Sequence, residues 1–464
     1  MPRNGLRAYA VSLLVMGLAS SAQASGFLNP RLADPHGHPA LANPYAVYFN
    51  PAALGGVQGT QLVIDGTLAY RTVDYTRTTS ALSPQLPTNL SNPTYVRANT
   101  GKAHAGNIAE IPFVAASSDF GTRQFFAGVG AYVPFGGAVK FDERPEFQGN
   151  TEARGALDGS QRWAVISGTQ RSLYTTAAAG FRLPDAGLSF GISGSVVFSE
   201  IKHNQARNIS GYDDTNIEGR ALVDVKGIEA AFSAGVYWEV LPKHALRIGA
   251  SYALRPALGQ MRLSGTLHQH YGKDELTKDV DFLQTYPDVI RLGLAARPWG
   301  DTVELRLEGE YVTWSVFDHQ CILEKGYECP IAPDGSEAGG GGHVILAIPR
   351  RWRDAGAVRA GAGYFLDEKT ELFGAVGYDT SAVPLATLET TYPDAFKLMG
   401  SLGARRAFTE TFALGASYTY VAYLPVTAPH QHQVDYAGAS KVPNEDGKYS
   451  SAVMFINVNA TFAF

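Results

Sequence analysis

Histidine is the side chain of this sequence best suited to hold a metal ion, and it occurs in three close pairs. The pairs are His36/His38, His268/His270 and His430/His432. On an extended backbone, two imidazoles spaced in this way face the same side and could bind one metal ion. None of the pairs has a third histidine and a carboxylate beside it in the sequence. We therefore expect no metal site and interpret all three pairs as solvent-exposed loop residues.

A ladder of charged side chains follows one face of the segment "VELRLEGEYV". Its members are Glu304, Arg306, Glu308 and Glu310. We interpret the ladder as a hydrogen-bonded network, with direct substrate contact as the alternative. Arg359 and Arg405 are expected to lie on neighbouring strands and to point to the same side as this ladder. Because guanidinium–carboxylate contacts can be bidentate, both arginines are candidate contacts for a substrate carboxylate, unless they neutralise the glutamates.

The only two cysteines, Cys321 and Cys329, lie eight positions apart in "CILEKGYEC". In an oxidising compartment we expect a disulfide between them, which the loop-entropy model values at roughly 2–3 kcal/mol. Catalytic signatures such as a Walker loop, C-x-x-C and H-E-x-x-H are absent from the sequence. His203 and His244 are poor candidates for the histidine of a membrane-embedded lipase. We therefore expect no catalytic residues, no enzyme activity and no cofactor.

The N-terminal residues have the features of a secretory signal. Arg3 and Arg7 precede the apolar stretch "AYAVSLLVMGLA", and "AQA" at 22–24 supplies a small-residue cleavage site. We expect residues 1–24 to be removed and the mature chain to begin at Ser25. The apolar stretch is shorter than the roughly 20 residues that a membrane-spanning helix needs. The formal net charge of −5 over 464 residues gives no reason to expect a nucleic-acid partner.

Alternation of apolar and polar residues recurs from residue 60 to the end of the chain. In the last segment, "MFINVNATFAF", apolar residues at every second position oppose Asn457, Asn459 and Thr461. Successive side chains of a strand point to opposite faces, so this pattern predicts a strand with one apolar and one polar face. Fourteen such segments are predicted, at 60–77, 107–119, 123–135, 169–183, 187–203, 222–240, 244–262, 285–298, 302–318, 353–366, 369–380, 394–408, 410–424 and 450–464.

Short and long connections alternate between these segments. "FGTR" (120–123) and "LPKH" (241–244) are short, whereas 319–352 and 425–449 are long. Tight periplasmic turns and large extracellular loops are typical of outer-membrane barrels, which satisfy every backbone amide internally. We therefore predict an all-β fold, a 14-stranded antiparallel transmembrane β-barrel formed by residues 60–464. A secreted soluble sandwich is the alternative, but it does not explain charged ladders on so many strands.

Residues 25–59 precede the first strand, contain five prolines and show no period. Because the lumen of so wide a barrel cannot be filled by side chains alone, we expect this segment to form an N-terminal plug, or hatch, inside it. In "AYVPFGGAVKF", Pro134, Gly136 and Gly137 surround Phe135 and disturb the third strand. Proline lacks a ladder donor, so we expect a kink with a gap beside it. The alternative is that this strand ends before Pro134.

These segments resemble one family of outer-membrane proteins. The stretches that carry the resemblance are "SGF" (Ser25, Gly26, Phe27), "NPAAL" (starting Asn50, Pro51, Ala52), "YVPFGG" (132–137), "YPDVIRLGLAARP" (286–298) and "RWRDAGAVRAGAGYFL" (351–366). In this order and spacing they are similar to the FadL family of transporters for long-chain fatty acids and hydrocarbons. The resemblance implies a fourteen-stranded barrel, an N-terminal hatch and a lateral opening near a kink in the third strand.

We therefore expect passive transport of hydrophobic molecules, either long-chain fatty acids or hydrocarbons, across the bacterial outer membrane. The substrate would bind in the plugged lumen and leave sideways near the kink. The expected partners are this substrate, the outer-membrane lipids and the barrel-assembly machinery, which would bind the C-terminal strand ending on Phe464. We expect a monomer. The alternatives are a general porin for polar solutes, an outer-membrane lipase and an adhesin.

Overall fold

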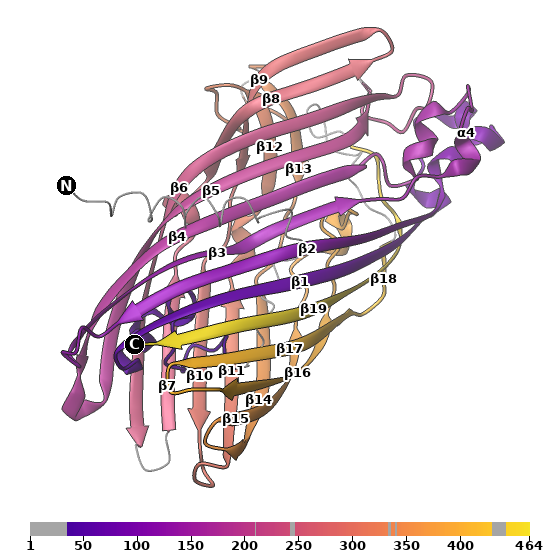
Figure 1. Ribbon diagram of the computed structural model, residues 1–464. Helices are drawn as coiled ribbons and strands as arrows, with labels where there is room; N and C mark the ends of the chain where they lie inside the picture. Colours follow the sequence, from indigo (N-terminus) through magenta and orange to yellow (C-terminus); the bar gives the residue numbers. More distant parts are fainter. Residues whose placement is uncertain (1–34, 209, 242–245, 333–335, 339–340, 429–441) are drawn as a thin grey trace, which may run out of the picture.

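A computed structural model describes residues 35–208, 210–241, 246–332, 336–338, 341–428 and 442–464. Antiparallel strands form one sheet, and its first strand pairs with its last, so the sheet closes into a barrel (Figure 1). The strands are β1 (Thr60–Arg77), β2 (Gly101–Ser118), β3 (Phe125–Lys140), β4 (Ser167–Leu183), β5 (Leu188–Arg207), β6 (Gly219–Leu241), β7 (Leu246–Ala253), β8 (Met261–Tyr271), β9 (Asp274–Gln284), β10 (Val289–Ala296), β11 (Val303–Val312), β12 (His319–Glu324), β13 (Val344–Pro349), β14 (Ala355–Asp367), β15 (Thr370–Asp379), β16 (Lys397–Ala407), β17 (Phe412–Tyr423), β18 (Val426–Ala428) and β19 (Gly447–Ala463).

Helices in the described residues are short and lie outside the strands. They are α2 (Ala46–Phe49), η1 (Pro51–Gly56), η2 (Thr79–Ala81), α3 (Pro87–Leu90), α4 (Pro93–Asn99), η3 (Pro145–Phe147), η4 (Arg154–Asp158), η5 (Pro184–Ala186), η7 (Pro256–Leu258), η8 (Trp314–Val316) and η9 (Leu385–Thr387). None of the helices that the structure describes is long and apolar enough to cross a bilayer.

The nineteen strand segments make fourteen transmembrane strands, because five of these strands are interrupted. The interrupted strands are β7/β8, β9/β10, β11/β12, β13/β14 and β17/β18, and both parts of each pair with a common neighbouring strand. For example, β7 and β8 both pair with β6 on either side of a bend at η7. The prediction of a 14-stranded antiparallel barrel is therefore confirmed.

Several predicted strand ends are wrong by a few residues, and one predicted loop contains two short strands. The third strand continues to Lys140, and the second begins at Gly101. The expected loop 319–352 contains β12 and β13, which lengthen the barrel together with β8 and β9 (Figure 1). In these extensions the apolar side chains point into the barrel, as Leu263 on β8 does. This orientation is the reverse of that in a lipid-facing strand.

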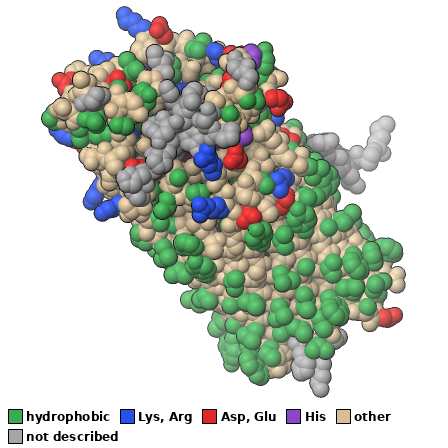
Figure 2. Space-filling model, turned by 180° about the vertical axis from the view of Figure 1, so that it is seen from behind, with side chains coloured by type: hydrophobic (Ala, Val, Ile, Leu, Met, Phe, Trp, Pro, Cys, Tyr) green, Lys and Arg blue, Asp and Glu red, His purple; other side chains and the backbone are tan. Residues whose placement is uncertain are grey.

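Apolar side chains form a continuous band around the outside of the barrel wall. Each of the fourteen strands contributes at least one exposed residue to it: Leu68, Ile108, Val129, Phe181, Ile192, Ile228, Tyr252, Leu292, Leu307, Val358, Val376, Leu402, Tyr418 and Ile456. Figure 2 shows this band over the lower part of the visible face, with charged side chains gathered above it. On β19, Asn457 and Asn459 are buried while Ile456 and Val458 are exposed, as the alternation predicts. The band is the surface that meets lipid.

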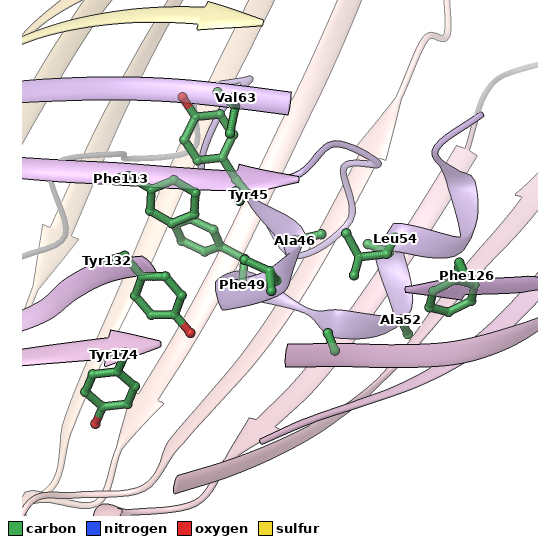
Figure 3. Close-up of a cluster of buried hydrophobic side chains, with 14 of the residues drawn as sticks. Tyr45, Ala46, Phe49, Ala52, Leu54, Val63, Phe113, Phe126, Tyr132 and Tyr174 are labelled. Atoms are coloured by element: carbon green, nitrogen blue, oxygen red, sulfur yellow. The ribbon is translucent and has the colours of Figure 1, made fainter. Parts of the chain in front are cut away.

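The segment from residue 35 to residue 59 packs inside the barrel. Tyr45 and Phe49 of this segment join one buried cluster with Phe113, Tyr132 and Tyr174 from the inner faces of β2, β3 and β4 (Figure 3). The rings of Tyr45 and Phe113 lie 4.7 Å apart, and those of Phe113 and Tyr132 stack at 5.3 Å. The described part of the expected hatch therefore fills the lumen beside the first strands. Ser25, Gly26 and Phe27 lie outside the described residues, as does the expected signal peptide.

Glycines on four strands let the hatch backbone approach the barrel wall. Gly191 on β5 lies opposite Gly235 on β6, and Gly249 on β7 lies opposite Gly293 on β10. A Cβ atom at Gly191 would lie 2.5 Å from the backbone nitrogen of Ala52, and one at Gly235 would overlap the side chain of Asn50. Backbone atoms can pack this closely only where the wall has no side chain. This glycine row forms the seat of the hatch.

We predict that Gly235→Val displaces the hatch without preventing barrel closure. The added side chain overlaps Asn50 and overpacks the seat, which costs about 1–3 kcal/mol or more, while the strand ladder of β6 is unchanged. In a Val47→Cys background, a membrane-impermeant maleimide should label the buried Cys side chain faster in the Gly235→Val variant. Gly400→Val is the matched control, because a Cβ there meets no atom within 4 Å. Equal labelling of both variants would contradict the prediction.

Candidate functional site

Asn50 forms hydrogen bonds with two other residues of the hatch and with one residue of β6. Its side-chain nitrogen donates hydrogen bonds to the backbone oxygens of Pro39, at 2.8 Å, and Val236, at 3.0 Å. Its side-chain oxygen accepts from the backbone nitrogen of Ala52 at 3.1 Å and caps η1, whose first residue is Pro51. Since Asn50 is fully buried, its own polar atoms depend on these contacts for their hydrogen bonds. Asn50 thus ties the hatch to β6.

The charged ladder of β11 forms ion pairs both within the strand, between Glu304 and Arg306, and with arginines on neighbouring strands. Glu304 pairs with Arg306 at 2.8 Å, and Glu308 pairs with Arg359 at 3.1 Å. Glu310 pairs with Arg291 of β10 at 2.8 Å. Buried charges of this kind are tolerated only when they are paired and hydrogen-bonded. The ladder is therefore a network within the wall, in line with the interpretation favoured from the sequence.

This network also reaches the hatch. Arg291 donates a hydrogen bond to the hydroxyl of Tyr48 at 2.9 Å, and its guanidinium lies 4.6 Å from the centre of that ring. On the other side, His38 lies 3.0 Å from the backbone oxygen of Leu307. Together with the Asn50 contacts, these interactions hold the hatch against β6, β10 and β11. On the opposite side of the lumen, the hatch packs against the aromatic cluster of β2, β3 and β4.

The hydrogen-bond ladder between β2 and β3 stops partway along the wall. The last paired residues are Phe113 and Tyr132, although β2 continues to pair with β1 along its whole length. On its other side, β3 pairs with β4 up to Lys140, with a register shift between Tyr132 and Phe135. Pro134, Phe135, Gly136 and Gly137 thus lie on a kinked stretch of β3 without a ladder partner on β2. The alternative that the third strand ends before Pro134 is wrong.

A second proline, missed in the sequence analysis, lies on the facing strand. Pro112 of β2 directly precedes Phe113, the last residue of β2 that pairs with β3. Pro112 has no amide hydrogen to donate. Pro112 and Pro134 therefore flank the point where pairing stops, one on each strand. Beyond them, the backbone nitrogen of Lys140 donates to the side-chain oxygen of Asn107 at 3.1 Å. The interruption is a bounded gap in the wall. In the sequence, the signal that could have revealed Pro112 is its position inside an alternating segment.

Inside the barrel, the extension strands enclose an apolar cavity, which we call the upper cavity. Its cavity volume is about 40 Å³, within about 690 Å³ of empty space that is partly open to solvent. Its apolar lining includes Ile201, Val223, Leu267, Phe282, Ile322 and Leu346 from β5, β6, β8, β9, β12 and β13. Each buried CH₂ group of a ligand gains about 0.8 kcal/mol on leaving water, so such an apolar lining favours hydrocarbon groups.

Polar groups from the connections between strands line one end of the upper cavity. Arg350 forms an ion pair with Glu389 at 2.6 Å, and both side chains line the cavity. Nearby, the backbone nitrogen and hydroxyl of Thr390 donate to the carboxyl of Glu445. Burial, followed by the negative charge of Glu389, raises the pKa of Glu445 to about 8. At neutral pH this carboxyl is therefore protonated and can lie near Glu389 without strong repulsion.

Candidate residues from the sequence analysis occupy several different places. Arg359 is engaged by Glu308, Glu310 and Asp379, whereas Arg405 lies near the C-terminal end of β16 opposite Glu371. The two arginines are thus not brought together. Cys321 and Cys329 are joined by a disulfide.

Histidines expected in exposed loops are partly misplaced. His36 and His38 are buried in the hatch, and both nitrogens of His38 have backbone partners. His268 and His270 lie on β8 instead of in a loop, because β8 extends the barrel beyond the predicted strand. His203 contacts the backbone oxygen of Ala164 and the side chain of Gln205. His430, His432 and His244 lie outside the described residues.

We predict that Asn50→Ala loosens the hatch, because it removes three hydrogen bonds to buried backbone groups. Each unsatisfied buried group costs about 1–3 kcal/mol. Cells that depend on the variant should become more sensitive to a small polar antibiotic, at equal levels of folded protein. Asn216→Ala, in an exposed loop, is the matched control and should have no effect. Unchanged sensitivity in the Asn50→Ala cells would remove the proposed role of this side chain.

Comparisons with known proteins agree with this architecture. A family described as "Outer membrane protein transport protein (OMPP1/FadL/TodX)" matches residues 36–464. No curated protein sequence matches the chain. Among solved structures, a Pseudomonas aeruginosa FadL homologue superposes with a TM-score of 0.73 at 15% identity, covering 96% of this chain and 99% of its own.

Two transporters of toluene also superpose on the chain. The Pseudomonas putida toluene transporter TodX has a TM-score of 0.62 at 13% identity and covers 96% of this chain and 100% of its own. The Ralstonia pickettii toluene transporter TbuX has a TM-score of 0.58 at 16% identity, covering 90% and 94%. At these identities the likeness shows the fold. With the match over residues 36–464, the chain belongs to the OMPP1/FadL/TodX family of bacterial outer-membrane transport proteins.

Proposed function

We propose that the protein carries hydrophobic molecules passively from the upper cavity through the gap between β2 and β3 into the outer membrane. The observation that carries this proposal is the interrupted ladder, because it places an unpaired stretch of wall beside the lumen cavities. A hydrophobic molecule released there would meet the apolar band of the barrel and then lipid. It would not need to enter the aqueous periplasm.

Aromatic side chains line the inner side of the proposed route. Phe135, on the unpaired stretch of β3, stacks on Tyr286 with the ring centres 4.6 Å apart. Tyr286 and Phe135 both pack with the apolar cluster that also contributes Ile201, Val223 and other residues to the upper cavity. A chain-like apolar ligand could therefore remain in contact with apolar surface from the upper cavity to the gap. Continuous contact keeps such a ligand out of water.

The hatch supports lateral release over passage along the barrel axis. Its described residues are held by Asn50 and Arg291, and its aromatic residues pack against β2, β3 and β4. Tyr132, the last ladder residue before the gap, also contacts the hatch through Tyr48, with ring centres 5.0 Å apart. A general porin for polar solutes would need an open aqueous path, which a packed and ion-paired hatch opposes. We infer that the hatch acts as a plug.

We predict that restoring the ladder closes the route. The test protein carries Pro112→Val, Pro134→Val, Gly136→Val and Gly137→Val, which return backbone donors to both strands and favour extended pairing. In cells lacking their own transporters for hydrophobic compounds, uptake of radiolabelled palmitate and of hexadecane should fall to background.

Pro298→Val, in an exposed periplasmic turn, is the control and should leave uptake unchanged. Folding is checked by the shift in gel mobility that boiling causes in an intact barrel. A folded variant with all four substitutions and full uptake would show that the substrate takes another route.

A further inference from the structure

Five charged side chains form a cluster on the outer wall of the barrel. Arg171 lies on β4, Glu200 and Lys202 lie on β5, and Asp224 and Lys226 lie on β6. These three strands are consecutive in the wall (Figure 1). We call these five residues the boundary cluster, because they lie where the apolar band ends.

The strand register fixes the position of the boundary cluster relative to this band. Arg171 is paired with Glu200, and Glu200 is paired with Lys226, so the three residues form one row across the wall. Phe198 and Ile228 belong to the next row on the same face, since side chains two positions apart on a strand point to the same side. They are 40% and 65% exposed and belong to the surface that meets lipid. The charges therefore begin directly where the apolar surface stops.

All three cations of the boundary cluster share the carboxylate of Glu200. Its oxygens lie 3.2 Å from a guanidinium nitrogen of Arg171 and 3.5 Å and 3.3 Å from the amino nitrogens of Lys202 and Lys226. Lys202 also lies 3.2 Å from a carboxylate oxygen of Asp224. Three cations thus share two carboxylates, and the cluster has an excess of positive charge. The chain as a whole has a formal net charge of −5.

The cations of the boundary cluster are accessible from outside the barrel. The side chains of Arg171, Lys202 and Lys226 are 33%, 48% and 65% exposed. Ion pairs as exposed as these contribute little to stability, so folding alone does not explain why three cations gather here. Long basic side chains can lay their apolar stems along a greasy surface and keep their charged ends in water. A ligand at the membrane surface can therefore reach several donors at once.

Position and charge together indicate the chemistry of this ligand. A molecule seated on the boundary cluster has apolar wall on one side and water on the other, as the headgroup of a membrane lipid has. Clusters of Lys and Arg beside a membrane bind anionic lipid headgroups, and a guanidinium can contact two oxygens of one phosphate. A free anion or an acidic protein would use the charges of the cluster but not the adjoining apolar band. The phosphate of a lipid uses both.

We propose that the boundary cluster binds the phosphate of an outer-membrane lipid whose acyl chains lie along the apolar band. Arg171, Lys202 and Lys226 contact the phosphate oxygens, and the acyl chains cover Phe198 and Ile228. The site lies on the outside of the wall. It is therefore separate from the lumen, and it does not depend on the route proposed for transported molecules.

Binding to the purified full-length protein in a neutral detergent tests the proposal without relying on uptake. The probe is radiolabelled lipid A, a phosphorylated glycolipid, and the competitors are unlabelled lipid A, dephosphorylated lipid A and inorganic phosphate. Dephosphorylated lipid A should compete about ten-fold or more weakly than lipid A. Arg171→Gln, Lys202→Gln and Lys226→Gln are combined in one variant. Its affinity for lipid A should fall roughly a hundred-fold, since each cation near an anionic membrane surface contributes about five-fold.

The matched control variant combines Arg154→Gln, Lys273→Gln and Lys325→Gln. These substitutions remove the same charges from exposed connections between strands. This variant should bind lipid A as wild type does. Glu200→Gln keeps all three cations and increases the excess of positive charge, so it should bind lipid A at least as tightly as wild type. The shift in gel mobility that boiling causes shows that each barrel is folded.

The proposal is overturned if dephosphorylated lipid A competes as well as lipid A, or if the folded cluster variant binds lipid A as wild type does. Equal losses in the cluster variant and in the control variant would show only a general attraction between charges, which also overturns it. Displacement by inorganic phosphate at the concentration at which lipid A displaces the probe would identify a site for a free anion instead. If the cluster variant does not fold, the three single variants replace it. Each should weaken binding about five-fold, and unchanged binding in all three would refute the site.

Discussion

Backbone hydrogen bonding in lipid is the constraint on which this structure depends. A polar backbone group that faces hydrocarbon without a partner costs several kcal/mol, so the sheet must close, and β1 pairs with β19. Against this background, an interruption in the ladder is a specialised feature. Pro112 and Pro134 reduce the number of unpaired donors at the gap, because neither has an amide hydrogen. The two prolines therefore make an opening possible at lower cost than other residues would.

Closing a barrel of this width creates a lumen that side chains alone cannot fill, and the hatch occupies part of it. The seat requires contacts between backbones, which is why Gly191 and Gly235 lie under Pro51 and Asn50. Polar atoms enclosed in this way need partners, and the arginine–glutamate network of β10, β11 and β14 supplies them. Tyr132 belongs both to the hatch cluster and to the end of the ladder. The plug and the gap are thus physically connected.

Above the band that faces lipid, the apolar side chains of the strands point into the barrel instead of outward. The extension strands β8, β9, β12 and β13 direct their apolar side chains inward, since water surrounds them outside. Their inner faces form part of the upper cavity. The same alternation of side chains therefore produces a surface for lipid in one part of the wall and a binding site in another. The surrounding solvent decides which face is apolar.

The sequence alone determined the barrel, the strand number and the disturbed third strand, because alternation, loop lengths and proline are local signals. Single residues in the family resemblance, such as Asn50, were also recognisable. Only the tertiary structure decided that Arg359 is saturated by three carboxylates, because pairing depends on side chains from distant strands. It also decided that β12 and β13 are strands, since their apolar residues face a lumen that forms only when the barrel closes.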